Sequence, residues 1–84
     1  MKKYTLKIVT PQKVFFDGEV VKTIARTTVG DIGILAGHEP YVAELKSGKL
    51  TYVLEDESRS TAETSGGMIK VGKDGVIILV QNAE

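Results

Sequence analysis

The chain lacks cysteine and tryptophan, contains a single histidine and has no excess of either charge. Without cysteine there is no disulfide framework, thiol nucleophile or cysteine-based zinc site. Eleven Lys and Arg residues balance eleven Asp and Glu residues, which argues against a nucleic-acid binder because such proteins usually carry a basic excess on one face. Zero net charge also gives copies of the chain little mutual repulsion, a composition that suits a component of an assembly.

Long apolar runs are absent as well. No stretch approaches the ~20 consecutive apolar residues that a membrane-spanning helix needs, and residues 1–4 are not followed by the apolar segment of a secretory signal. The sequence therefore predicts a chain that is soluble on its own, without a targeting segment. Its 84 residues are enough for one domain, residues 1–84, with one modest hydrophobic core.

What the sequence does contain is a hydrophobic pattern with a period of two. In the first apolar run Leu6 and Ile8 alternate with Thr5 and Lys7, as in a strand with one buried face. Turn signals, including Asp17-Gly18, recur every six to ten residues along the chain, which predicts an all-β sandwich or small barrel without helices. The predicted strands are residues 4–10, 14–16, 19–28, 41–45, 49–54, 59–64, 68–71 and 76–80. We expect the apolar strand 76–80 to be central, and the polar strand 59–64 either to lie at an edge or to have one solvent-facing side.

The most distinctive segment is GDIGILAGHEP, residues 30–40, which holds three glycines, the only histidine and one of the two prolines. Because glycine allows unusual backbone angles and proline restricts them, the segment predicts a shaped loop. Asp31 near its tip is either a solvated turn residue or a charge that meets a basic group on a partner. Ile34 and Leu35 belong either to the core or to an exposed docking patch.

His38 is the one candidate for a general base, with Asp31, Glu39 and Glu44 nearby in the sequence. No cysteine nucleophile exists and no serine lies in a G-x-S-x-G elbow. No ligand spacing supports a metal site, and the glycines at residues 65–67 indicate a tight corner more than an anion cradle. The sequence thus favours a protein without catalytic residues, cofactor or metal. A small hydrolase or metal-dependent enzyme centred on His38 is an open alternative.

Taken in order, these segments resemble the N-terminal β-sandwich domain of the epsilon subunit of F-type ATP synthase over essentially the whole chain. The matching segments are LKIVTP (6–11), VF (14–15), DGEV (17–20), GDIGIL (30–35), GH (37–38) with Pro40, LKSG (45–48), SGG (65–67), DGV (74–76) and AE (83–84). The loop pattern G-[DE]-[IL]-G-I-x-x-G-H-x-P is a fairly specific signature. Ala36 and Glu39 depart from it, since the family usually has proline and often alanine there. These two departures imply a less rigid loop and a more acidic partner contact.

The resemblance implies a flattened β-sandwich of about ten short strands. It implies a non-catalytic rotor (central-stalk) subunit that docks the gamma subunit onto the c ring and helps couple ion flow to ATP synthesis. Such a subunit is attached peripherally at the cytoplasmic face of the bacterial cell membrane. The family's C-terminal helical hairpin, which is linked to inhibition of ATP hydrolysis and in some members to ATP binding, has no counterpart in this sequence, so neither activity is carried over.

Residue by residue, the resemblance places two contact sites. The predicted c-ring contact consists of Gly30, Asp31, Ile32 and Gly33, and the predicted gamma contact consists of Thr10, His38, Pro40, Tyr41 and Val42. Asp31 is expected to face polar loops of the ring, where basic residues are expected. A free-standing β-sandwich interaction module of another assembly is the alternative, because a shared architecture does not determine function.

Overall fold

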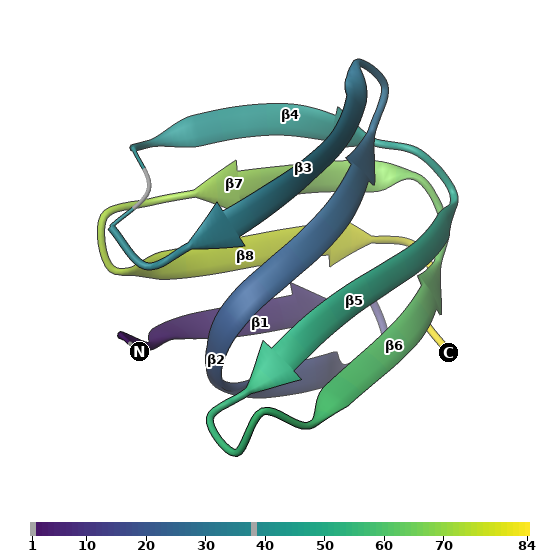
Figure 1. Cartoon of the computed structure of the whole chain (residues 1–84). Coiled ribbons are helices and arrows are strands. Elements are labelled where there is room, and N and C mark those ends of the chain that lie inside the picture. The colour runs from purple at the N-terminus through teal and green to yellow at the C-terminus, as the bar shows by residue number, and fades with distance from the viewer. Residues whose placement is uncertain (1, 38) are drawn as a thin grey trace.

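The computed structural model describes residues 2–37 and 39–84. This part of the chain contains strands and no helix (Figure 1). The strands are β1 (Tyr4–Val9), β2 (Val14–Thr27), β3 (Gly30–Leu35), β4 (Tyr41–Leu45), β5 (Gly48–Leu54), β6 (Arg59–Thr64), β7 (Gly67–Val71) and β8 (Gly75–Val80). The predicted all-β class is confirmed. His38, one of the predicted gamma contacts, lies outside the described residues.

The strands form two layers that cross at an angle. In Figure 1, β4, β7, β8 and β1 lie behind, and β3, β2, β5 and β6 run diagonally in front of them. Hydrogen bonding follows the order β1-β8-β7-β4-β2-β5-β6, with β3 beside β2 and a further pairing of β1 with β2. Because the path returns to β2 at both ends of the rear layer, the sheet folds back on itself as a flattened sandwich of 30 × 23 × 18 Å.

The long strand β2 belongs to both layers. Its first half pairs with β1, where Tyr4 lies opposite Val20, and its second half pairs with β3 and β5. A register shift between Val20 and Lys22 marks a bulge, and the burial pattern fits it, since Val20 and Val21 are consecutive and both buried. Such bulges bend a strand and increase its twist, which is what lets one strand cross from layer to layer.

The predicted turn at Asp17-Gly18 is wrong, because both residues lie inside β2 and pair with Lys7 and Leu6 of β1. Gly18 serves packing: a Cβ there would come within 3.0 Å of the Phe16 ring, which itself packs on Tyr52 with ring centroids 4.5 Å apart. The two strands expected on either side of this turn are therefore one. Gly30–Leu35, which was expected to be a loop, is in turn an additional strand. The described chain has eight strands, fewer than the roughly ten that the resemblance implies.

The core lies between the layers and consists mainly of aliphatic side chains. Leu6, Ile8, Val20, Ile69 and Ile78 are fully inaccessible to solvent, and burial of a side chain of this size contributes ~1.5–3 kcal/mol. The positions of two strands follow the prediction. β8 lies between β1 and β7. Among the described strands β6 pairs with β5 alone, and its other edge is bonded to the chain end through the Thr64–Ala83 bridge and the Glu63–Glu84 backbone hydrogen bonds.

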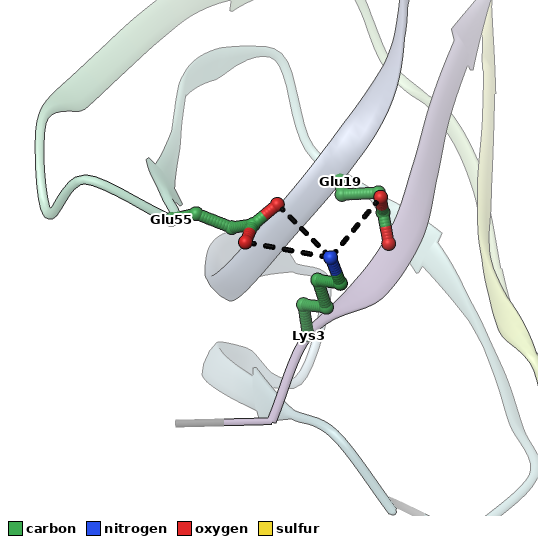
Figure 2. Close-up of polar contacts among 3 residues, drawn as sticks. All are labelled: Lys3, Glu19 and Glu55. Atoms are coloured by element: carbon green, nitrogen blue, oxygen red, sulfur yellow. Dashed lines mark hydrogen bonds and ion pairs between the residues drawn. The ribbon is translucent and has the colours of Figure 1, made fainter.

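A charged contact joins the start of the chain to the front layer. Lys3 Nζ lies 3.4 Å from Glu55 Oε1 and 3.5 Å from Glu19 Oε1 (Figure 2). The hydrogen bond that Lys3 donates to Glu55 and the negative charge of Glu19 raise the pKa of Lys3. All three side chains are about half exposed, so solvent screens these pairs and they position the chain more than they stabilise it.

Candidate docking surfaces

The β2–β3 hairpin projects beyond the sheet and ends in a tight, braced turn (Figure 1). The Thr27 hydroxyl donates to the Gly30 carbonyl at 2.6 Å and accepts the Val29 N–H at 3.2 Å. Gly30 has a φ of +125°, a conformation that residues with a side chain rarely adopt. Thr27 is itself buried. The turn is therefore held by a side chain on the core side, while its outer residues face solvent.

The expected shaped loop over residues 30–40 is only half right. Gly30–Leu35 is the regular strand β3, antiparallel to β2, and the actual tip is Val29, which is 82% exposed. The reason is the alternation in this run: Ile32 and Ile34 turn toward the core while Asp31 and Leu35 turn outward. Ile34 is therefore a core residue, and Leu35 is the exposed member of that pair.

All four predicted c-ring contacts lie together on this hairpin. Asp31 is exposed and lies directly opposite Arg26 of β2, which is also exposed. Ile32 packs against the core from the opposite face of the strand. Gly33 has ordinary backbone angles, and a Cβ there would meet only the Lys22 side chain at 3.7 Å. Asp31, together with the exposed tip, is thus the part of this group that a partner can reach directly.

The predicted gamma contact Thr10 uses its side chain inside its own turn. Its hydroxyl donates to the Lys13 carbonyl at 3.1 Å and accepts the Lys13 N–H at 3.2 Å, and the residue is 7% exposed. These bonds close the connection between β1 and β2. Thr10 can therefore shape a contact surface, but its hydroxyl is already engaged.

The other described gamma candidates are divided by the alternation of β4. Pro40 is exposed just before the strand, Tyr41 packs against the core, and Val42 is 57% exposed on the outer side. Successive side chains of a strand point to opposite faces, so Tyr41 and Val42 do not present one common surface. Val42 is the member that faces outward from the rear layer.

Val42 belongs to an apolar surface that the sequence prediction missed. Cross-strand register places Val42 opposite Lys70, Lys70 opposite Ile77, and Met68 opposite Leu79. Met68, Ile77 and Leu79 are 42–51% exposed. We call the surface formed by Val42, Met68, Lys70, Ile77 and Leu79 the outer face. The signal was available, since residues 76–80 are all apolar although only alternate side chains of a strand reach one core.

A shallow hollow of about 420 Å³ continues the outer face toward the β1–β2 turn. Val9, Thr10 and Pro11 line one side of it, and Met68 and Leu79 line the other. The hollow therefore joins the buried Thr10 to the surface that includes Val42. Two predicted gamma contacts thus lie at opposite margins of one continuous apolar region.

Within residues 2–37 and 39–84, no group of three or more His, Asp and Glu side chains is arranged to hold a metal ion. The described part also contains no helix long and apolar enough to cross a membrane. The features that the fold does present are an exposed hairpin tip and an apolar sheet face. Exposed apolar surfaces of this kind are typical of sites at which proteins dock on other macromolecules.

Comparison with known proteins agrees with this class. Residues 3–84 match the family model described as ATP synthase, Delta/Epsilon chain, beta-sandwich domain. The chain is 44% identical to the ATP synthase epsilon chain of Chlorobaculum tepidum over 80 residues, which cover 95% of this chain and 91% of the relative. It is 43% identical to the epsilon chain of Alkaliphilus metalliredigens over 82 residues, which are 98% of this chain and 60% of that relative.

A solved structure is similar over nearly the same length. A chain in the cryo-EM structure of the Euglena gracilis mitochondrial ATP synthase, comprising OSCP, F1 and c-ring, superposes with a TM-score of 0.92 at 27% identity. The match covers 98% of this chain and 52% of the Euglena chain. This chain belongs to the ATP synthase delta/epsilon β-sandwich domain family, and the resemblance inferred from its sequence is confirmed.

Proposed function

We propose that this chain is a rotor subunit of an F-type ATP synthase, in which it docks the gamma subunit onto the c ring and helps couple ion flow to ATP synthesis. The observation that carries the proposal is the pair of separate docking features on one rigid sandwich. The related epsilon chains and the Euglena assembly, which contains F1 and the c ring, support the role. In it the domain is non-catalytic and transmits force through its contacts.

The hairpin tip is the proposed c-ring contact, formed by Gly30, Asp31, Ile32 and Gly33. Asp31 supplies an exposed carboxylate beside the braced turn, and Val29 adds an exposed apolar tip. An exposed ion pair contributes only ~0–1 kcal/mol, so the Asp31 charge sets the register of the contact more than its affinity. The turn's internal hydrogen bonds fix the backbone from which both side chains project.

The outer face and the residues at its margins are the proposed gamma contact. Thr10, Pro40, Tyr41 and Val42 were predicted for it together with His38, and the exposed apolar side chains of β7 and β8 extend it. A stable interface of ~1,600 Å² in total needs a surface of this extent, and its apolar centre is typical of such interfaces. Peripheral attachment at the cytoplasmic face of a bacterial membrane follows from this placement in the complex.

The test is binding of this chain to purified gamma subunit, with Val42→Asp compared with the wild type. Val42 is the better target than Tyr41, because Tyr41 packs against the core and its replacement would also disturb the fold. Thr61→Asp is the matched control, since it places the same charge on an exposed strand position of β6.

We expect the wild type and Thr61→Asp to form a stoichiometric complex and Val42→Asp to lose most of its affinity. A folded wild-type chain that does not bind gamma would overturn the proposal. That result would favour a free-standing β-sandwich interaction module of another assembly. Circular dichroism of all three proteins keeps loss of binding distinct from loss of folding.

A further inference from the structure

We propose that Lys70 is a charged anchor of the outer face and pairs with a carboxylate of the gamma subunit. The inference rests on the proposed function and goes beyond it by stating the chemistry that the partner must present. It concerns a residue on β7 that lies in none of the segments on which the family resemblance depends.

The register of three strands places Lys70 between apolar side chains. Val42 of β4 lies directly opposite it on one side, and Ile77 of β8 lies directly opposite it on the other. Val42 is 57% exposed and Ile77 is 42% exposed, and directly opposed residues share a face of the sheet. A partner that covers these two side chains must therefore cover Lys70 as well.

No ion pair of Lys70 occurs within the described part of the chain. The nearest carboxylate by register is Glu44, which lies diagonally across β4, opposite Met68 and not Lys70. Lys70 is exposed, so water solvates its ammonium group as long as the outer face is free. Docking removes that water, and a buried ammonium without a partner is strongly unfavourable.

A partner built to cover this face has to offset the lost hydration. The direct way is a carboxylate above Lys70, which would form a charge-assisted hydrogen bond inside an apolar surround. Such central, desolvated charges contribute to specificity, whereas charges at the rim contribute little. The outer face therefore selects a surface that is apolar with an acidic group near its centre.

Lys7 provides an internal comparison on the same layer. It lies opposite Ile77 on the other side of β8, about 10 Å from Lys70 by the usual strand spacing. Unlike Lys70, Lys7 lies opposite Asp17 of β2, and these two residues line a second hollow beside Ile77, separate from the one next to Thr10. Lys7 therefore has an acidic neighbour of its own and lies at the margin of the apolar region.

The experiment measures the dissociation constant for purified gamma subunit with the wild type, Lys70→Met and Lys7→Met. Methionine keeps the apolar stem length and removes only the charge, and both sites are solvent-accessible strand positions, so each variant should fold. We expect Lys70→Met to weaken binding at least about tenfold, because the partner's carboxylate is left buried without a cation. Lys7→Met should stay within about twofold of the wild type, as expected for a solvent-screened charge at the rim of an interface.

The salt dependence supplies a second readout. Wild-type affinity should fall between about 0.05 and 0.3 M salt, and this fall should be smaller in Lys70→Met. Unchanged or tighter binding of Lys70→Met would overturn the inference while the proposed function stands, since the wild type still binds gamma. Failure of the wild type to bind gamma, whether because a second copy occupies the outer face or because the partner differs, overturns both.

Discussion

The hydroxyl oxygens of Tyr4 and Thr23 lie 2.7 Å apart in the interior, between β1 and β2. The Tyr4 hydroxyl also donates to the Ile34 carbonyl at 3.0 Å, so its single proton is used there and the Thr23 hydroxyl donates to Tyr4. One phenol thus connects β1 with both strands of the hairpin that carries Asp31. Burial raises the pKa of Tyr4 because the phenolate would be poorly solvated in this position.

We expect Tyr4→Phe to lower the free energy of unfolding by about 1–2 kcal/mol at pH 7, because Thr23 and the Ile34 carbonyl lose a buried partner. Tyr52→Phe is the control. Tyr52 is also largely buried, but among the described residues its hydroxyl has no hydrogen-bond partner. Urea denaturation of the two variants measures the difference, and equal losses would contradict the assigned role of the network.

The alkaline limit of stability should depend on the same residue. Since folding raises the pKa of Tyr4, its contribution is complete below the unfolded pKa of ~10 and is lost as the pH rises from there toward the folded value. The free energy of unfolding should therefore fall more steeply above pH ~10 in the wild type than in Tyr4→Phe. Parallel curves for the two proteins would show that ionisation of this phenol does not affect stability.

Position 30 requires glycine because of its backbone conformation, and not because a side chain there would meet a neighbour. Its φ is +125° and no atom lies within 4 Å of the position that a Cβ would occupy, so Gly30→Ala should cost about 1–3 kcal/mol from strain alone. Gly33→Ala, on the same strand with ordinary angles and only Lys22 nearby, should be close to neutral. Thermal unfolding of both variants measures the two losses of stability. A neutral Gly30→Ala would show that the turn does not need glycine at this position and that the Thr27 hydrogen bonds hold it.

Position 67 requires glycine because β8 leaves no room for a Cβ there. A Cβ there would overlap the Leu79 carbonyl oxygen and come within 2.9 Å of Val80 Cγ1. Gly67→Ala should therefore push β7 from β8 and lower stability by about 2–3 kcal/mol. Gly72→Ala at the other end of β7 meets only the Gly75 carbonyl, at 3.6 Å, and serves as the control in the same urea titration. Because Gly67 also lines the hollow beside the outer face, any folded Gly67→Ala protein should bind gamma less well.

Asp31 gives a prediction for the other docking feature. If the hairpin tip contacts basic groups of the c ring, Asp31→Asn should weaken association with purified ring by up to about fivefold at low salt, and the difference should vanish at high salt. Asp74→Asn removes the same charge from the exposed β7–β8 turn and should have no effect. Equal affinities of the two variants would remove Asp31 from the contact.

Part of the candidate site was readable from the sequence and part was not. The glycine-rich segment marked Gly30 and Asp31 as unusual, and the family resemblance made them a predicted contact. The tip was nevertheless placed two residues too late, since Thr27 closes the turn through side-chain bonds that no periodicity reveals. Met68 and Lys70 were not identified, because a short run such as residues 68–71 does not tell which face of a strand will be covered.

The sequence by itself determined the β class, the central position of residues 76–80 and membership of the family, because these depend on local alternation and on a specific motif. Tertiary structure decided the rest. Only the bulge at Val21 makes β2 one strand shared by two layers, and only the register of β4, β7 and β8 puts Val42, Lys70 and Ile77 side by side. Long-range pairing sets which residues become neighbours, and a docking surface is made of such neighbours.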